Sequence, residues 1–498
     1  MKRTITAISC IVMLLAGAGM LMAGGQADDD GGEALSERHG GILRVAQTTD
    51  IRGADPTSMG QTQELIFRQV FDTLITLSKD GNLTPQPLLA ESWEWNDDKT
   101  ELTFNLREGV TFHSGTELTA DAVIANIEYL QTPEAASKLR GTLAAITDME
   151  AVDDYTVRLV LDDFSAALIG AFTMLWIIDP AVLGEDNMMV GTGPFTWEEW
   201  LPGTSVTLER YDSYWDGDLP YLDEIQILAQ PDAQKMLANL QSGAADVIKF
   251  PPLADVPGIM EQDDFMVEVS DVHNSFYAVA FNTEDDVLGD ARVRRALAHT
   301  MPRERFVENH LYGISRPQSI LFATTSAAYN EELNDFYAYD LDAARSLLEE
   351  AGHGDGFDTS IMVAPSLDEN HLRFVIMWQQ ELEKIGVNME INQVERAVWV
   401  DNKRGGTFPQ MLADLYGRAQ KEPVEMLLQS LPFVPDGNPA RFIDEEYQDL
   451  VRRAANEPSD SERAEIYAQI NDLLLREAFE VPVAPQVRTW AMRADIEG

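Results

Sequence analysis

Residues that could carry out catalysis are numerous in this chain, but they do not have the spacing that catalysis needs. The motifs Gly-x-Ser-x-Gly, Ser-x-x-Lys with its partners, and His-Glu-x-x-His do not occur in a usable context. The seven histidines, from His39 to His371, are scattered without the spacing of metal ligands. The 84 acidic residues are so many that assigning any two as acid and base would be arbitrary. We therefore predict no catalytic residues, no metal site and no cofactor.

One glycine-rich loop could be mistaken for a phosphate-binding loop. Gly191-Thr192-Gly193-Pro194 lacks the glycine, lysine and hydroxyl spacing of such a loop, and Pro194 removes an amide donor. We expect a close-packed crossing between lobes at this point instead.

Two other sets of residues are expected to have structural roles. Gly109 and Gly115 fit the ends of a tight turn that displays His113. Three arginines, at positions 292, 294 and 295, open a helix near Asp290, and we expect them to hold packing together.

Strand and helix patterns alternate along the first half of the chain. A strand is expected at 42–46, and an amphipathic helix near 62–77. Apolar and polar residues alternate on both sides of the turn at 96–99, which predicts a hairpin with one buried face. Thr119 could cap a helix that runs to Leu130. Further strands are expected at 155–161, 206–208 and 225–227.

The second half is more helical. Asp340 begins a helix that Gly352 closes, and another runs from about 371 to 385 before Gly386. A capping box at 459–462 opens a third helix, and a last strand-like segment covers 481–483. This mixture predicts an α/β or mixed α+β fold with more than one lobe.

The N-terminal segment has the three parts of a secretory signal. Lys2 and Arg3 precede an apolar run, and small residues follow it up to Ala27. We predict a signal peptide at 1–27, although cleavage after Ala23 and retention as a membrane anchor are alternatives. Cys10, the only cysteine, lies in the middle of the apolar run, which disfavours a lipoprotein.

The net charge of −48 becomes −50 once the two basic residues of the predicted signal are removed. Such a surface repels phosphates, so nucleic acids and anionic lipids are poor partners. The acidity fits an ordinary exported protein or one adapted to salt, where repulsion is screened.

Four stretches occur in an order that resembles one known family. The first joins LAESWEW at 89–95, LREGVTFHSG at 106–115 and LTADAV at 118–123. The second joins GTGPF at 191–195, Tyr211, Tyr214-Trp215 and LDEI at 222–225. The third joins FNT at 281–283 and DARVRRAL at 290–297, and the fourth is the segment 343–352, with Ala-x-x-Leu-Leu-x-x-Ala-Gly. In this combination the chain resembles the family 5 extracellular solute-binding proteins, which include oligopeptide-, dipeptide- and nickel-binding receptors.

The resemblance implies a two-lobed periplasmic binding protein of type II with an extra inserted domain. Lobe I is expected at 28–62, 189–270 and 480–498, the inserted domain at 63–188, and lobe II at 271–479. It implies a monomeric receptor of an ABC importer that captures a small solute between hinged lobes and delivers it to permease subunits at the membrane. An exported hydrolase and a surface adhesin are the alternatives from other classes.

In peptide-binding relatives an acidic residue of the second lobe, shortly before an Asp-Pro or Glu-Pro pair, binds the peptide amine. Here Glu422-Pro423 matches the end of that stretch, but the position of the acidic residue falls on a gap or on Arg418. Asp414 and Glu422 are the acidic residues that could substitute.

A second departure from the family lies upstream, where Arg396 occupies the position of a usual tryptophan. Guanidinium groups bind carboxylates and repel an ammonium, so two arginines favour an anionic or sugar-like ligand over an ordinary peptide. An oligopeptide-like ligand remains the first expectation. Aromatic residues that could stack on the ligand, or could equally be core, are Trp399, Tyr416, Tyr277 and Trp176.

Overall fold

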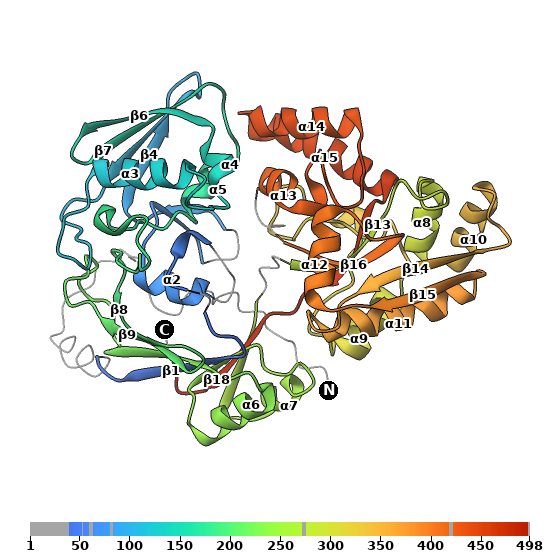
Figure 1. The fold of residues 1–498 in the computed structure, drawn as a ribbon, viewed down its shortest axis with the longest axis horizontal. Coiled ribbons are helices and arrows are strands. Elements are labelled where there is room, and N and C mark those ends of the chain that lie inside the picture. The colour runs from blue at the N-terminus through green and yellow to red at the C-terminus, as the bar shows by residue number, and fades with distance from the viewer. Residues whose placement is uncertain are drawn as a thin grey trace, which may run out of the picture. The chain divides into compact units, whose positions relative to one another are not determined.

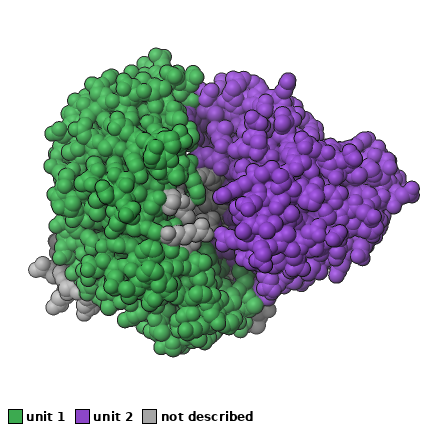
Figure 2. Space-filling view, in the orientation of Figure 1, with its two compact units in different colours: residues 1–164, 168–269, 489–498 green, residues 165–167, 270–488 purple. Residues whose placement is uncertain are grey.

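The computed structural model describes residues 39–51, 53–58, 63–79, 83–270, 275–417 and 422–496. The chain forms two compact units, which are coloured separately in Figure 2. The first unit comprises the described parts of 1–164, 168–269 and 489–498, and the second unit those of 165–167 and 270–488. The predicted signal peptide lies outside the described residues. Within them, no helix has both the length and the apolar character that crossing a bilayer requires.

A seven-stranded mixed sheet forms the base of the first unit (Figure 1). Its order is β12-β18-β11-β1-β10-β9-β8, and β1 pairs in parallel with both β10 and β11. The strands are β1 (Ile42–Gln47), β8 (Phe195–Leu201), β9 (Ser205–Arg210), β10 (Glu224–Ala229), β11 (Val247–Lys249), β12 (Phe265–Val269) and β18 (Thr489–Arg493). Helices α6 (Ala233–Ser242) and α7 (Val256–Met260) supply apolar side chains that pack with Ala46 and Ile248 of this sheet. The strands expected near 42, 206 and 225 are confirmed.

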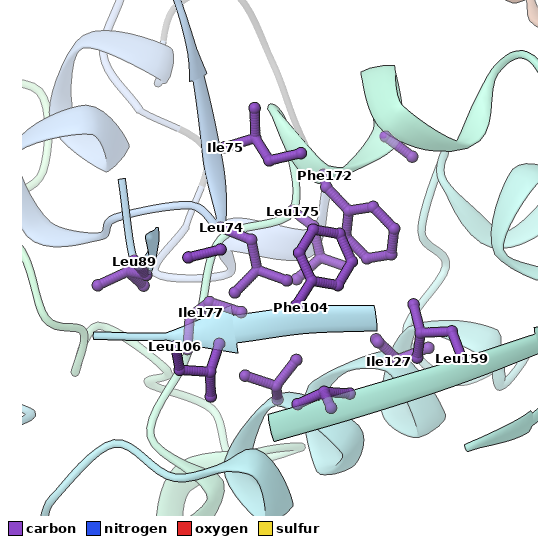
Figure 3. Packing of buried hydrophobic residues seen from close by; sticks show 14 of the residues in the cluster. Leu74, Ile75, Leu89, Phe104, Leu106, Ile127, Leu159, Phe172, Leu175 and Ile177 are labelled. Atoms are coloured by element: carbon purple, nitrogen blue, oxygen red, sulfur yellow. The ribbon is translucent and has the colours of Figure 1, made fainter. Parts of the chain in front are cut away.

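A smaller four-stranded sheet has a core of its own in the first unit. Its order is β4-β5-β7-β6, and its strands are β4 (Ala90–Trp95), β5 (Glu101–Leu106), β6 (Ile146–Asp153) and β7 (Thr156–Leu161). Three helices accompany it, α3 (Ala120–Gln131), α4 (Arg140–Leu143) and α5 (Leu168–Phe172). Figure 3 shows Phe104 of the sheet beside Phe172 of α5, with ring centroids 4.8 Å apart. The predicted hairpin is confirmed, because Trp93 lies opposite Phe104 and Trp95 opposite Leu102.

The helix expected over 62–77 is much shorter in the structure. Helix α2 spans Glu64–Val70, and Phe71 already has extended backbone. The chain then forms β2 (Ile75–Leu77), which pairs with β3 (Pro85–Pro87). The carboxylate of Asp72 is buried and accepts hydrogen bonds from Trp215 Nε1 at 3.0 Å and Thr192 Oγ1 at 3.1 Å. These long-range contacts outweigh the local helical periodicity, which is a weak preference.

The glycine loop at 191–194 is a close-packed crossing, but it packs within the first unit and not between lobes. A Cβ atom on Gly191 would lie 2.2 Å from the carbonyl oxygen of Val70, and one on Gly193 would lie 2.6 Å from that of Gln69. His113 fixes the other side of the loop, since its Nδ1 accepts from Gly191 N–H at 3.4 Å and its Nε2 lies 2.9 Å from Gly193 O. Burial lowers the pKa of His113, which keeps the ring neutral with the proton on Nε2.

The second unit is built on one five-stranded sheet of order β15-β14-β16-β13-β17. Its strands are β13 (Ser275–Phe281), β14 (Phe357–Val363), β15 (Val387–Gln393), β16 (Met411–Gly417) and β17 (Glu480–Pro485). Its helices are α8 (Ala291–His299), α9 (Arg303–His310), α10 (Leu341–Glu350), α11 (Glu369–Glu383), α12 (Arg396–Gly405), α13 (Pro423–Gln429), α14 (Glu445–Asn456) and α15 (Asp460–Glu477). The mixed α/β fold class is therefore confirmed.

The predicted helix ends of this unit follow their capping residues. The Asp340 side chain accepts from the amides of Asp342 and Ala343, and Gly352 adopts a positive φ just beyond α10. Helix α11 begins two residues earlier than predicted, because Asp368 caps it. Arg294 has the expected packing role: its buried guanidinium donates to carbonyl oxygens of Leu288, Gly289 and Glu477.

The boundary expected at residue 480 lies elsewhere. Strand β17 pairs with β13 over its length and therefore belongs to the second unit, whose last residue is Arg488. Only 489–498 return to the first unit, where β18 pairs with β11 and β12. Pairing partners decide this boundary, and the apolar sequence of β17 suits either sheet.

Candidate ligand-binding site

One edge of the second unit's sheet carries two of the predicted ligand-binding residues, Arg396 and Glu422. Strands β14, β15 and β16 are parallel, and β16 and β17 both run antiparallel to β13. These four strands therefore end at the same edge, which we call the carboxyl edge. Ligands of open α/β sheets bind outside the carboxyl ends of the strands. Arg396 follows β15, Glu422 follows β16, Asp368 follows β14 and Gln486 follows β17.

Arg396 is the first residue of α12, and its side chain is exposed. Among the residues that the structure describes, none forms an ion pair with Arg396. Its guanidinium group is therefore available to an anion, and the N-terminal end of a helix adds a favourable partial charge. Arg418, the second arginine of the prediction, lies outside the described residues.

Two of the predicted aromatic residues are held in the interior of the second unit. Trp399 is 6% exposed, and its indole Nε1 donates to Ala413 O at 3.0 Å. Tyr416 is 2% exposed, stacks on Phe276 with ring centroids 5.1 Å apart, and donates its hydroxyl hydrogen to Leu321 O at 2.8 Å. Both side chains support the carboxyl edge from within.

Glu422 is engaged by its neighbours. Tyr467 donates its hydroxyl hydrogen to Glu422 Oε1, and Arg463 Nε lies 3.7 Å from the same oxygen. Burial raises the pKa of Glu422, although both partners oppose this shift. This carboxylate stabilises the start of α13 against α15.

Asp414 lies on β16 in a buried charged cluster with Lys403 of α12 and Glu480 of β17. The ammonium of Lys403 contacts Asp414 Oδ1 and donates to Leu415 O at 2.9 Å. Asp414 is fully buried and Glu480 is 2% exposed. Burial raises the pKa of Asp414, and burial together with Asp414 raises that of Glu480 well above its usual range. One cation thus faces two buried carboxyl groups, and burial disfavours the charged form of both.

Tyr277 is buried on the opposite face of the sheet. Its hydroxyl donates to Asp368 Oδ2 at 2.6 Å, and its ring lies edge-on to Phe306 and to His371. Burial lowers the pKa of His371 to about 4, so this histidine is neutral at pH 7. Tyr277 therefore positions Asp368 at the carboxyl edge.

Trp176 differs from the other predicted residues, because it belongs to the first unit. It is 7% exposed, packs edge-on against Phe67, and carries the guanidinium carbon of Arg68 5.6 Å from its ring centroid. Trp176 is part of a hydrophobic core cluster of that unit.

Sequence reasoning missed three polar residues of this region. Glu480 stands among apolar neighbours in the sequence, and a charged residue inside an apolar segment is a usable but weak signal. Lys403 lies between Asn402 and Arg404 in a polar stretch, which gives no such signal. Asp368 could have been found as a helix N-cap, since it precedes α11 directly.

Comparison with known proteins identifies the family. The family model described as bacterial extracellular solute-binding proteins, family 5 Middle, matches residues 84–430. Heme-binding protein A of Haemophilus influenzae is 28% identical over 475 residues, covering 88% of this chain and 86% of the relative. The dipeptide-binding protein of Escherichia coli is 24% identical over 474 residues and covers 88% of each chain.

Solved structures show the same fold. NikA from Brucella suis in complex with Fe(III)-EDTA has a TM-score of 0.82 at 22% identity, covering 92% of this chain and 96% of that one. DppA from Helicobacter pylori in complex with the peptide STSA has a TM-score of 0.77 at 23% identity, covering 94% and 96%. Because the family model covers more than half of the sequence, the chain belongs to the bacterial extracellular solute-binding proteins of family 5.

Proposed function

We propose that this protein is the receptor of an ABC importer, which binds a small solute, leaves it chemically unchanged and delivers it to a membrane permease. The family match supports this role. The similar H. pylori protein is described as an ABC transporter-associated periplasmic binding protein. The signal-like segment at 1–27 supports export to the periplasm or an equivalent compartment. The strongly negative charge argues against nucleic-acid partners, and a monomer is the state we expect.

The receptor works by hinge closure. The chain passes from the first unit to the second after residue 269 and returns after residue 488, with a short excursion at 165–167. A solute that contacts both units in the closed state shifts the population toward that state. A change from mostly open to mostly closed needs about 5.5 kcal/mol of differential affinity, which a few buried hydrogen bonds and one charge pair supply.

The charges at the carboxyl edge favour a ligand with a carboxylate or another anionic group at this end. Asp414 is buried against Lys403, and Glu422 is bound by Tyr467 and Arg463, so neither is open to the ammonium of a ligand. Arg396 is exposed at the same edge. The engagement of Asp414 by Lys403 is the observation that carries this ligand class.

An ordinary peptide bound through its free amine is the second candidate. The similarity to the dipeptide-binding protein of E. coli favours it. A peptide also carries a C-terminal carboxylate, so binding of N-acetylated and C-amidated forms of one peptide distinguishes the two ligand ends. Loss of binding on amidation supports an anion site, whereas loss on acetylation supports an amine site.

Mass spectrometry of the solute released when the purified protein is denatured tests the receptor role. We expect one class of small molecule, recovered intact and able to raise the melting temperature when added back. Dipeptides, glutathione, haem and nickel chelates form a suitable first panel, since similar proteins bear the names of these solutes. A candidate solute that is cleaved indicates a hydrolase, and the absence of any ligand-dependent shift indicates a surface adhesin.

A further inference from the structure

Asp368 joins three parts of the second unit through one carboxylate. Its Oδ1 accepts from the backbone amide of Asn370 at 2.9 Å and caps α11. Its Oδ2 accepts from the hydroxyl of Tyr277 at 2.6 Å and from Nε2 of Gln486 at 3.0 Å. The carboxylate therefore connects the start of α11, strand β13 and the segment that follows β17.

Gln486 lies on the segment through which the chain leaves the second unit. Its backbone amide donates to Ser275 O at 2.8 Å, at the start of β13. Closer to the boundary, the amide of Ser270 donates to Arg488 O at 2.9 Å, and Val269 pairs with Thr489. The segments on which the chain enters and leaves the unit are thus hydrogen-bonded to each other in antiparallel directions, and both continue into paired strands.

The two ends of this connection differ in how firmly they are held. Tyr277 is 2% exposed and packed between Phe306 and His371, so Asp368 has a rigid anchor in the sheet. Gln486 is half-buried and follows the last residue of β17. Asp368 is therefore held on one side by the sheet and on the other by the less firmly held segment that leaves the unit.

We propose that Asp368 is a positioning residue that couples the carboxyl edge of the second unit to the hinge, with Gln486 as its partner on the hinge segment. A solute bound beside the first turn of α11 fixes Asp368 and, through it, the direction of the strand that leaves the unit. This inference rests on the proposed receptor function for the role of the hinge. The hydrogen-bonded connection itself is testable without any solute.

Substitutions that change which residue of the Asp368–Gln486 contact carries the carboxylate test the proposal. Gln486→Glu places two carboxylates against each other. We expect hydrogen exchange of the backbone amides of residues 486 and 270 to accelerate about tenfold, because one hydrogen bond to a charged group is lost. Asp368→Asn combined with Gln486→Glu exchanges the donor and the acceptor: one hydrogen of the new amide nitrogen is donated to residue 486 and the other to the Tyr277 hydroxyl oxygen, which then accepts. We expect exchange to return to within about twofold of the wild-type rate. Gln469→Glu adds the same charge to an exposed position of α15 and is the matched control.

The motion of the hinge is measured separately. Spin labels on Val152→Cys and Ile443→Cys, in a Cys10→Ser background, report the distance between the two units from exposed positions that are 53% and 69% accessible. We expect a wider distance distribution with Gln486→Glu and the wild-type distribution with the double variant and with Gln469→Glu.

The proposal is overturned if Gln486→Glu leaves both amide exchange and the distance distribution unchanged. It is equally overturned if the double variant behaves like Gln486→Glu, because the effect would then come from the substitution and not from the contact. Neither experiment contains a solute. A failure of solute binding would therefore affect the proposed function and leave these two results intact.

Discussion

Lys403 and Asp414 form an ion pair inside the second unit, with 11% and 0% of their side chains exposed. The pair joins α12, which begins with Arg396, to β16, which leads toward Glu422. Removing one partner of such a pair leaves a buried charge without compensation, which is far worse than losing an exposed pair.

Lys403→Met is therefore expected to lower the free energy of unfolding by about 3–5 kcal/mol. Urea unfolding followed by tryptophan fluorescence measures this. Arg345→Met, which removes an exposed ion pair with Asp342 in the same unit, is expected to change it by less than about 1 kcal/mol. Equal effects of the two substitutions would contradict a buried, structurally required pair.

Gly193→Ala is expected to destabilise the first unit strongly. The new Cβ would lie 2.6 Å from Gln69 O and 2.8 Å from Phe71 N, so backbone must move, and we expect a loss of about 2–4 kcal/mol. Gly141→Ala is the matched control, because its Cβ would have no neighbour within 4 Å and the residue lies in helix α4. Thermal unfolding of the two variants checks the prediction, and similar melting temperatures would refute the close crossing.

Asp72 should give the first unit a measurable pH dependence. Burial raises the pKa of Asp72 to about 6, although hydrogen bonds from Trp215, Thr192 and Tyr214 oppose the shift. Because the folded-state pKa lies above the unfolded value of about 3.9, the folded protein holds the extra proton. The resulting stabilisation is fully present below about pH 4 and is lost as the pH rises through about 6.

The comparison with Asp72→Asn isolates this effect, since all other carboxyl groups are common to both proteins. The unfolding free energy of the wild type minus that of the variant should fall by about 2 kcal/mol between pH 4 and pH 7. Urea titrations at a series of pH values in this range measure the difference. A difference that does not change with pH would mean that Asp72 titrates normally.

Arg396→Ala is expected to weaken binding of the native solute by about 10- to 100-fold if its guanidinium holds an anionic group of the ligand. Isothermal titration with the solute identified by mass spectrometry measures the change. Arg404→Ala, an exposed arginine near the other end of α12, should leave the affinity unaltered. Unchanged affinity in the Arg396 variant would exclude Arg396 as a ligand contact.

Many of the helices and strands could be predicted from local sequence patterns. Alternation in 93–106 predicted the hairpin, and the caps at Asp340 and Ser459 predicted helix starts that are confirmed. These features depend on neighbours within a few residues, which the sequence displays directly. The prediction of a helix over 62–77 was wrong because distant residues decide the conformation there. Asp72 is hydrogen-bonded to Thr192 and Trp215, more than a hundred residues away.

The candidate site shows the same division. The sequence by itself determined that the chain belongs with solute-binding receptors, because motifs and residue types are local properties. Only the tertiary structure decided that Tyr416 and Trp399 are interior supports, that Lys403 neutralises Asp414, and that β17 belongs to the second unit. Burial and charge pairing join strands that are distant in the chain, and no local pattern encodes which strand becomes the neighbour of which.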